Sequence, residues 1–271
     1  MVTQGAAQPA PVALVTGAAR GIGAAVAARL ADQGWKLVLL DACADDPALA
    51  YPLATREQLQ LTVAACGGPG SALGVVADVR DQHALDAAAA AAEERFGGLT
   101  AVVAAAGAIT GGAPGWETTD TAWRAMIDVN LEGVWRTARA TVPVLLRQAD
   151  PGHGRLVAVA SAGGLIGLPQ LAAYVAAKHG VVGLVRSLAA ELGPSGVTVN
   201  AVAPGSTDTH MLAASADVYG LSDPAELARH HLNQRLIEPQ EVASLICWLC
   251  GQESGAVTGA VLPVDGGMTA H

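Results

Sequence analysis

Short apolar runs alternate along the chain with longer segments that have the length and composition of helices. Strands that are apolar at every position are typical of a parallel sheet that is covered by helices on both faces. The alternation therefore predicts an α/β fold with a doubly wound, mostly parallel sheet. The expected strands are 12–16, 36–40, 72–76, 99–104, 154–160, 197–202 and 261–264, and the expected helices are 24–32, 82–95, 119–146, 172–192 and 239–250.

The same pattern indicates one domain. No shift in composition marks a linker, so residues 12–271 are expected to form a single domain behind a flexible arm, residues 1–11. Hydrophobic residues make up 52% of the 271 positions and charged residues only 14%. A chain this apolar must bury more surface than usual, which favours a doubly wound sheet, an oligomer or both.

The charge balance argues against a nucleic-acid partner, because the formal net charge is −9 and such a partner needs a basic surface. No apolar run approaches the roughly 18 uninterrupted residues that a membrane span needs. The first residues, MVTQGAAQPAP, lack a basic region followed by an apolar stretch. We therefore expect no secretory signal and a cytoplasmic location.

The cysteines and histidines do not predict a metal site. The four cysteines are too few and too scattered for a disulfide framework. Cys247 and Cys250 have the CxxC spacing, but they lie in an apolar run, which favours core packing over redox or metal chemistry. His210 and the pair His230-His231 have no carboxylates at a supporting spacing.

The turn TGAARGIG, residues 16–23, separates the first expected strand from the first helix. Glycines at this spacing allow a tight turn, a close backbone approach to a pyrophosphate and close helix–sheet contact. The helix N-terminus adds unpaired N–H groups and positive dipole charge. The turn therefore predicts nucleotide binding and a Rossmann-type domain, and its residues are Gly17, Arg20, Gly21, Ile22 and Gly23.

Asp41 stands at the tip of the second expected strand. A carboxylate there can accept hydrogen bonds from ribose hydroxyls and would repel a 2′-phosphate. Arg20 could attract such a phosphate, but Asp45 and Asp46 follow Asp41 and no basic residue does. The local charge favours NAD over NADP, with a strand-end cap as the alternative role for Asp41.

Ser161, Tyr174 and Lys178 are the candidate chemical groups. Tyr174 and Lys178 are four residues apart on an expected helix and so share a face, while Ser161 ends the preceding strand. A free tyrosine has a pKa near 10, too high for a base at neutral pH. We expect the Lys178 ammonium to stabilise the phenolate and to lower the pKa of Tyr174.

Together these motifs resemble the short-chain dehydrogenase/reductase (SDR) family, over about Val12–Met268. The resemblance implies an NAD-dependent enzyme that interconverts alcohols and ketones by hydride transfer. The matching motifs are TGAARGIG at 16–23, Asp78-Val79, AAAG at 104–107, Asn130 in MIDVNLEG, Ser161, YVAAK at 174–178, PGSTDT at 204–209 and VDGG at 264–267.

The resemblance also implies a catalytic tetrad of Asn130, Ser161, Tyr174 and Lys178. Tyr174 would exchange a proton with the substrate oxygen, and Ser161 would orient the substrate. Lys178 would lower the pKa of Tyr174 and bind the nicotinamide ribose. Asn130 would hold a water that links Lys178 to solvent.

The cofactor site is likewise implied by the resemblance. Asp78 and Val79 would contact the adenine, and the backbone near Thr207 with the Thr209 hydroxyl would hold the carboxamide. Ala105 stands where the family commonly has asparagine, which puts cofactor affinity in doubt. The full expected set is Gly17, Arg20, Gly21, Ile22, Gly23, Asp41, Asp78, Val79, Ala105, Gly107, Tyr174, Lys178, Pro204, Gly205, Thr207 and Thr209.

Residues 42–55 form an insertion between the second strand and its helix. Thr55 and Gln58 resemble a capping box, so the helix is expected to begin only after the insertion. We hypothesise that 42–55 folds over the adenosine and slows NAD release, with Tyr51 as the covering side chain; a plain surface loop is the alternative. The stretch resembles the mycofactocin-coupled SDRs of actinobacteria, which implies NAD that is reoxidised in place by a peptide-derived carrier.

Segment 209–236 corresponds to the family's mobile substrate lid. Its apolar side chains suit a hydrophobic secondary alcohol or ketone. The apolar helices 119–146 and 172–192 suit packing between subunits of a homodimer or homotetramer. The expected pocket residues are Ile109, Leu165, Leu168, Met211, Leu212 and Tyr219.

Two other functions remain open at this point. One is an ordinary ketone or 3-oxoacyl reductase whose cofactor exchanges freely. The other is a nucleotide-binding protein that has kept the fold without catalysis, against which the complete tetrad argues.

Overall fold

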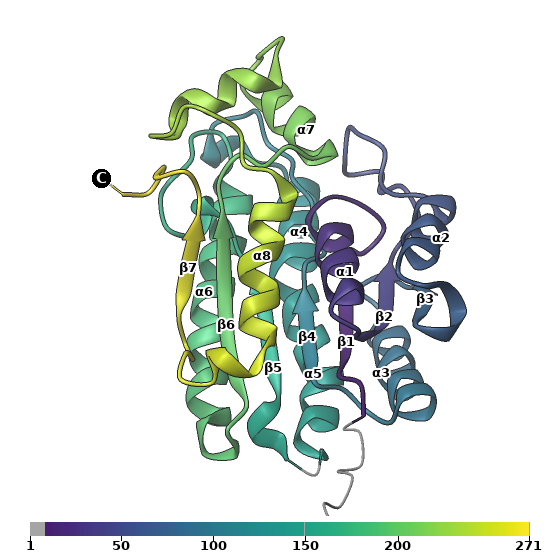
Figure 1. Ribbon diagram of the computed structural model, residues 1–271. Coiled ribbons are helices and arrows are strands. Elements are labelled where there is room, and N and C mark those ends of the chain that lie inside the picture. Colours follow the sequence, from purple (N-terminus) through teal and green to yellow (C-terminus); the bar gives the residue numbers. More distant parts are fainter. Residues whose placement is uncertain (1–8, 149, 271) are drawn as a thin grey trace, which may run out of the picture.

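A seven-stranded sheet forms the centre of the computed structural model, which describes residues 9–148 and 150–270 (Figure 1). The strand order is β3-β2-β1-β4-β5-β6-β7, and every neighbouring pair is parallel. The predicted fold class is confirmed, whereas residues 1–8 of the expected arm lie outside the described residues. The strands are β1 (Val12–Thr16), β2 (Lys36–Asp41), β3 (Ala72–Val76), β4 (Ala101–Ala104), β5 (Arg155–Val159), β6 (Thr198–Pro204) and β7 (Val261–Val264).

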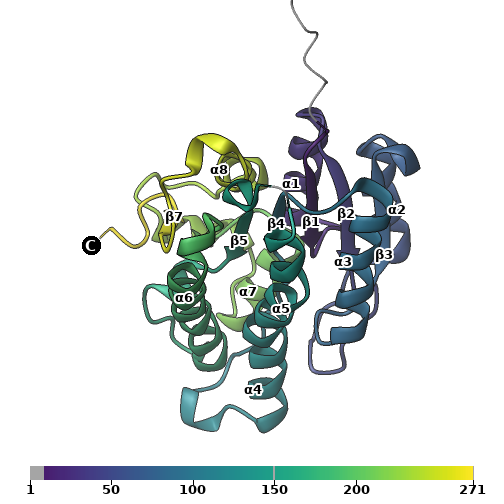
Figure 2. The same cartoon turned by 90° about the horizontal axis from the view of Figure 1, so that it is seen from below.

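Helices cover both faces of the sheet (Figure 2). Helices α1 (Gly21–Asp32), α2 (Arg56–Ala65) and α8 (Pro239–Cys250) lie on one face, and α3 (Gln82–Phe96), α5 (Gly133–Leu146) and α6 (Ala172–Leu192) lie on the other. Each face has its own core. Leu14 of β1 belongs to one core and the next residue, Val15, to the other, so both faces of this strand must be apolar.

The expected helix 119–146 is not one regular α-helix. It consists of α4 (Asp120–Ile127), a π-helical turn (Asp128–Glu132) and then α5. Asn130 lies in the π turn and is fully buried, and its side-chain amide donates to the Met126 oxygen one turn earlier, at 3.1 Å. Single π turns of this kind are frequent at functional sites.

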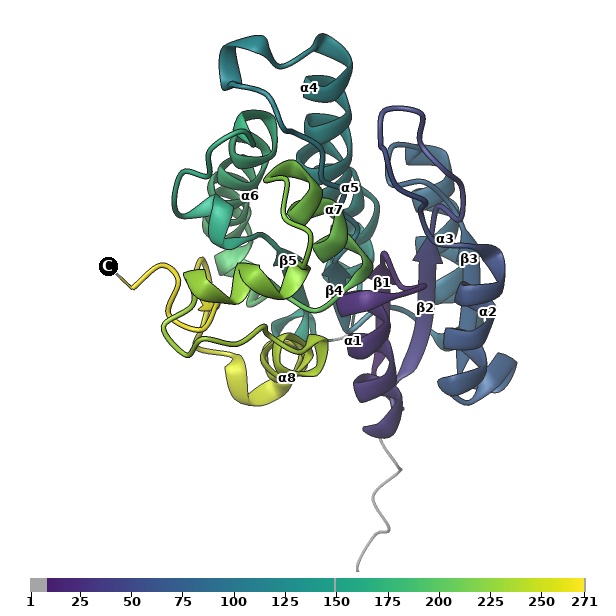
Figure 3. The same ribbon diagram turned by 90° about the horizontal axis from the view of Figure 1, so that it is seen from above.

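Strand order reverses between β1 and β4, because β2 and β3 extend the sheet on one side and β5 to β7 on the other. In doubly wound folds, ligands bind outside the carboxyl ends of the strands at this switch point. Seen from above, α7 (His210–Val218) lies over the carboxyl ends of the central strands (Figure 3). The insertion between β2 and α2 rises at the same end of the sheet, across from α7 (Figure 1).

Cys247 and Cys250 are both buried in the core between α8 and the sheet, which agrees with the packing role expected for them. Within the described ranges, no helix is both long and apolar enough to cross a membrane.

Candidate active site

Two adjoining cavities open at the carboxyl ends of the strands. The glycine turn, Asp41 and Asp78 line the first, and Ser161 with Tyr174 lines the second. Every catalytic and cofactor-binding residue expected from the sequence lines at least one of them. The residues shared by both cavities are Ile22, Ala105, Gly107, Thr209 and Met211.

The glycine turn has no room for side chains at two positions. Gly17 has a φ of +66°, and a Cβ on it would lie 2.8 Å from the Ala106 Cα. A Cβ on Gly23 would lie 2.1 Å from the Gly17 oxygen. Since only glycine fits, the backbone of this turn and the N-terminus of α1 form the wall of the first cavity, as a pyrophosphate requires.

The loop after β4 is held to β1 without the asparagine that the family commonly has at position 105. The Thr16 hydroxyl accepts hydrogen bonds from the N–H groups of Ala105 and Ala106, both at 3.1 Å. Thr16 therefore joins the glycine turn to the opposite wall of the cleft.

Asp41 is both a cap and a cavity residue. One carboxylate oxygen accepts from the Ala19 N–H at 3.0 Å, and the other accepts from the Cys43 N–H at 3.3 Å. These bonds hold the end of β2 against the glycine turn while the side chain still lines the first cavity. Arg20 also lines this cavity, but its guanidinium donates to the Pro52 oxygen of the insertion at 2.9 Å.

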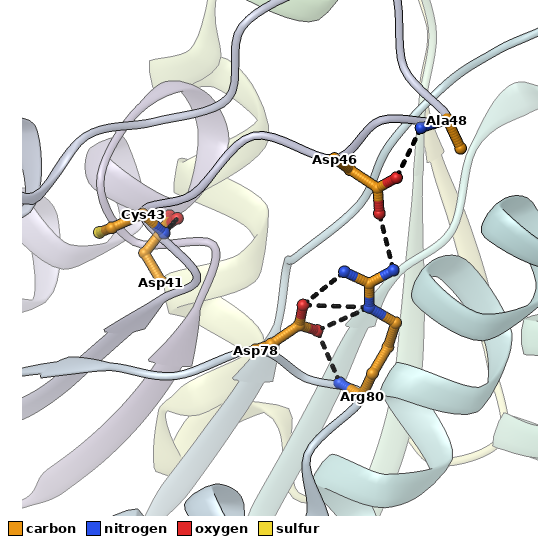
Figure 4. A network of polar contacts seen from close by, with 6 residues as sticks. All are labelled: Asp41, Cys43, Asp46, Ala48, Asp78 and Arg80. Carbon is orange, nitrogen blue, oxygen red and sulfur yellow. Dashed lines mark hydrogen bonds and ion pairs between the residues drawn. The ribbon is translucent and has the colours of Figure 1, made fainter.

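Arg80 joins the insertion to the end of β3 (Figure 4). Its guanidinium binds both oxygens of Asp78, with a closest contact of 2.6 Å, and reaches Asp46 of the insertion at 2.7 Å. Asp46 is only 9% exposed, and its second oxygen accepts from the Ala48 N–H at 2.8 Å. Burial acts to raise the pKa of Asp78, but the hydrogen bonds from Arg80 outweigh it and hold that pKa below its usual value.

Tyr51 connects the insertion to the loop after β4, on the other side of the cleft. Its hydroxyl accepts a hydrogen bond from the Ile109 N–H at 3.0 Å. Leu49 and Tyr51 belong to one apolar cluster with Tyr174 and with Met211 of α7. The insertion, residues 42–55, is therefore anchored at several walls of the cleft, and we call it the clasp.

Ser161, Tyr174 and Lys178 lie together on the wall of the second cavity. Ser161 follows β5, and its hydroxyl oxygen accepts from the Gly163 N–H at 3.1 Å. Tyr174 and Lys178 come from the first turns of α6 and are 8% and 4% exposed. The Lys178 ammonium donates to the Val159 oxygen at 2.9 Å and lies 5.8 Å from the centroid of the Tyr174 ring.

The acidity of this pair differs from the sequence-based expectation. Burial raises the pKa of Tyr174, and the neighbouring Ser161 hydroxyl offsets only part of that rise. Burial also lowers the pKa of Lys178 to about 8. The expected lowering of the Tyr174 pKa by Lys178 was wrong for the chain by itself, because desolvation of both groups dominates and the ammonium points at the Val159 oxygen.

Asn130 fixes the loop after β4 beside Lys178. Its side-chain oxygen accepts from the Ala108 N–H at 3.1 Å, and its amide donates to the Ala108 oxygen at 3.0 Å. A Cβ on Gly107 would lie 3.1 Å from that Asn130 oxygen and 3.7 Å from the Lys178 Nζ. The Asn130 side chain, Gly107 and the Lys178 ammonium therefore lie close together.

The second cavity has a volume of about 550 Å³ and a mainly apolar wall. Leu165 was wrongly placed in it, because that side chain packs against the core under α6. The pocket residues that the sequence did predict correctly are Ile109, Leu168, Met211, Leu212 and Tyr219.

His231 supports the loop after β6. Its Nε2 accepts from the Ser206 N–H at 3.0 Å, and its Nδ1 lies 2.6 Å from the Arg235 oxygen. This buried histidine holds the loop that carries Thr207, a supporting role that sequence reasoning did not find. Over residues 9–148 and 150–270, no three histidine, cysteine, aspartate or glutamate side chains gather as metal ligands would.

Comparison with known proteins agrees with this geometry. A family model described as enoyl-(acyl carrier protein) reductase matches residues 17–269. A (−)-trans-carveol dehydrogenase of Rhodococcus erythropolis is 38% identical, over 95% of this chain and 97% of that protein. The crystal structure of a carveol dehydrogenase from Mycobacterium avium in complex with NAD superimposes with a TM-score of 0.90, at 35% identity over 97% of this chain and 99% of that one. A short chain dehydrogenase from Mycobacterium paratuberculosis bound to NAD gives a TM-score of 0.85, at 31% identity over 97% and 99% of the two chains.

The chain belongs to the short-chain dehydrogenase/reductase family. It is therefore an oxidoreductase, as the motifs predicted.

Within this SDR site, sequence reasoning missed Arg80 and the role of Asp46. Arg80 stands only two residues after Asp78, in the stretch ADVRD, so a basic residue beside an expected adenine contact was the available signal. Its partner Asp46 is 34 residues away, and nothing in the local pattern joins the two.

Proposed function

We propose that this SDR enzyme interconverts a hydrophobic secondary alcohol and its ketone by hydride transfer. Its cofactor is NAD. This fits the first cavity, which is enclosed by the glycine turn and by carboxylates. The observation that carries the proposal is the position of Ser161, Tyr174 and Lys178 on the wall of an apolar cavity that adjoins the glycine turn. The carveol dehydrogenases among its relatives act on an alcohol of this kind by name, which supports the same substrate class here.

In this proposal NAD accepts or supplies the hydride, and side chains of the chain handle the proton. The Tyr174 hydroxyl exchanges a proton with the substrate oxygen, and Ser161 donates a hydrogen bond to the same oxygen. Lys178 binds the nicotinamide ribose, and its charge favours the Tyr174 phenolate once the site is filled. Asn130 uses one lone pair of its side-chain oxygen on Ala108 and keeps the second for a water beside Lys178.

The proposed cofactor contacts follow the two cavities. Asp41 would accept from the adenosine ribose, Asp78 and Val79 would contact the adenine, and Thr207 with Thr209 would hold the carboxamide. The remaining residues of the proposed cofactor site are Gly17, Arg20, Gly21, Ile22, Gly23, Ala105, Gly107, Pro204 and Gly205.

A matched pair of alcohols tests the proposed reaction. Cyclohexanol carries a hydrogen on its carbinol carbon, whereas 1-methylcyclohexanol has none to transfer. We expect the purified protein to reduce an artificial electron acceptor, or added NAD, with ring alcohols of the first kind and not with the second. Absence of any oxidation across secondary ring alcohols, with either acceptor, would contradict the proposal.

We further propose that the clasp retains NAD through turnover, so that a mycofactocin-type carrier reoxidises it in place. Three contacts support retention: Arg20 with Pro52, Arg80 with Asp46, and Tyr51 with the Ile109 N–H. They attach the clasp to three different loops at the rim of the first cavity. NAD release would therefore require these contacts to separate together.

The retention proposal predicts that NAD stays with the protein through exhaustive desalting. Asp46→Asn should speed NAD exchange at least tenfold, because it removes the charge that Arg80 binds from the clasp. Retention in the wild type and exchange in the variant are both measured by releasing the bound nucleotide with acid and quantifying it by absorbance. Glu93→Gln is the matched control, since it breaks the surface pair with Arg147, away from the cleft, and should leave retention unchanged. Protein that emerges empty and turns over freely with added NAD would refute retention.

We also propose a homodimer or homotetramer in which α5 packs against a second copy. Trp135 and Leu146 of α5 and Trp123 of α4 are each more than two-fifths exposed, and a second copy packed against α5 would cover such side chains. Light scattering after size exclusion would measure the mass, and a monomer would contradict this.

A further inference from the structure

We propose that the substrate carries an anionic group, and that Arg229 binds this group at the outer end of the second cavity. The inference rests on the proposed alcohol–ketone reaction and deepens it by naming a substrate class. An alcohol with an apolar body and an acidic end would place its carbinol at Tyr174 and its anion at Arg229.

The charge of the second cavity is the first observation. Its ionisable lining side chains are Tyr174, Lys178, Tyr219, Arg229 and His230. Among the residues that the structure describes, no aspartate or glutamate lines this cavity, although the chain as a whole has a formal net charge of −9. The first cavity differs, since three carboxylates line it beside two guanidinium groups. The second cavity is therefore suited to an anion in a protein whose surface otherwise repels one.

The backbone that carries Arg229 is held firmly on the lid. Arg229 lies in a 3₁₀ segment, Pro224–His230, whose first turn is capped because Asp223 accepts from the Ala225 N–H at 2.9 Å. Leu227 of this segment is buried against Leu212 of α7. Arg229 is therefore fixed in place by the packing of segment 209–236 beside the substrate cavity.

The guanidinium of Arg229 keeps donors for a ligand. Its nearest carboxylate, on Glu226, is 3.9 Å away, which is too far for a hydrogen bond. By contrast, the guanidinium groups of Arg80 and Arg235 contact their carboxylates at 2.6 Å. The Arg229 Nε donates to the His230 Nε2 at 3.4 Å, which aligns the guanidinium at the cavity. Planar guanidinium is well matched to a carboxylate or phosphate.

His230 is the second basic group at this end. Burial lowers the pKa of His230, and the positive charge of Arg229 lowers it further. A neutral His230 accepts the Arg229 hydrogen bond and leaves Arg229 as the cation at this end of the cavity.

Two sources could supply the anion, namely a carboxylate on the substrate itself or a phosphate on a carrier that delivers an acyl group. Arg229 would bind either anion in the same way. Different arms of one experiment distinguish the carboxylate from the phosphate. Arg229 is 58% exposed, so we expect an effect of about tenfold rather than the larger effect of a buried pair.

The experiment compares an acid with its uncharged amide. 4-Hydroxycyclohexanecarboxylate and 4-hydroxycyclohexanecarboxamide have the same carbinol and nearly the same shape, and the cyclopentane analogues form a second pair. We expect kcat/KM to favour the acids about tenfold, mainly through KM. Arg229→Gln should bring kcat/KM for the acids down to the value for the amides, and Arg229→Lys should keep part of the preference.

Arg147→Gln is the control, because it removes one positive charge from the surface pair with Glu93. It should leave the preference unchanged. A third arm uses 3-hydroxybutyryl-coenzyme A. If the wild type prefers this thioester over both acids, and Arg229→Gln abolishes that preference, the anion that Arg229 binds is the carrier phosphate.

The outcomes separate the two proposals. If the wild type oxidises acids and amides equally well, or if Arg229→Gln leaves an acid preference intact, the assignment to Arg229 is overturned and the alcohol–ketone reaction stands. If no acid, amide or thioester reacts, and no neutral ring alcohol does, the proposed function fails and the assignment fails with it.

Discussion

Replacing Tyr174 by phenylalanine should lower kcat for alcohol oxidation by a factor of about 10² to 10⁴, the range that a positioned proton donor or acceptor contributes. The substitution removes one oxygen from a buried ring and keeps the ring itself in the cavity wall. NAD retention should stay at the wild-type level, because the clasp contacts do not involve the Tyr174 hydroxyl. Steady-state rates with an artificial acceptor and NAD content after desalting measure the two effects.

Tyr219→Phe provides the comparison for Tyr174→Phe. Tyr219 lines the same cavity, but its hydroxyl donates to the Pro169 oxygen at 3.2 Å and lies on the lid side. Its loss should change kcat by less than about threefold and act mainly on KM. If both variants lose the same amount of kcat, or if Tyr174→Phe is fully active, Tyr174 does not take part in the proton-transfer step.

Lys178→Met should stabilise the fold at pH 7 while it abolishes activity. Burial lowers the pKa of Lys178 from 10.5 to about 8, so the folded chain bears the cost of an enclosed ammonium at neutral pH. The shift corresponds to about 3 kcal/mol in the free energy of unfolding. Methionine has a similar shape and no charge, and it loses only the bond to the Val159 oxygen. Urea unfolding of the nucleotide-free proteins measures the difference.

The pH dependence of that difference has a definite sign. Below pH 8 both the folded and the unfolded chains hold the Lys178 proton, so the full destabilisation is present. Between pH 8 and 10.5 the unfolded chain binds more protons at this site than the folded chain, so wild-type stability gains relative to Lys178→Met as pH rises. The advantage of the variant should therefore shrink over this range.

Lys36→Met, at the other lysine of the chain, serves as the control for the substitution because Lys36 donates to Gly70 and Ser71 near the surface. It should not stabilise the fold at pH 7. A Lys178→Met variant that is less stable at pH 7, or whose difference from the wild type does not depend on pH, would contradict the burial argument.

The sheet could be predicted because its strands are apolar on both faces. The expected strands 72–76 and 261–264 and the expected helices 172–192 and 239–250 coincide with β3, β7, α6 and α8. The capping box at the start of α2 is also present, with the Thr55 hydroxyl accepting from the Gln58 N–H and the Gln58 side chain accepting from the Thr55 N–H. Local hydrogen bonds and periodicity suffice for such features.

Features that depend on contacts between distant segments could not be predicted. The π turn at Asn130 forms against the backbone of Ala108, 22 residues earlier, and no local signal precedes it. The ion pair of Arg80 with Asp46 likewise depends on how the clasp folds back. The direction of the Tyr174 pKa shift required the depth of burial, which the spacing of Tyr174 and Lys178 does not reveal.

The capping box of α2 also bears on how this enzyme could have diverged within its family. Because Thr55 and Gln58 form the first turn of α2, and Ala54 is buried in the core, the helix needs only the last two residues of the clasp to begin. A hydrogen bond within the clasp joins its two ends, because the Asp45 carboxylate accepts from the Leu53 N–H at 2.7 Å. A change of length before Ala54 would leave the capping bonds that begin α2 in place. Under the proposed retention role, a change in the clasp would alter cofactor exchange and, through Leu49 and Tyr51, also the apolar cluster that holds Tyr174.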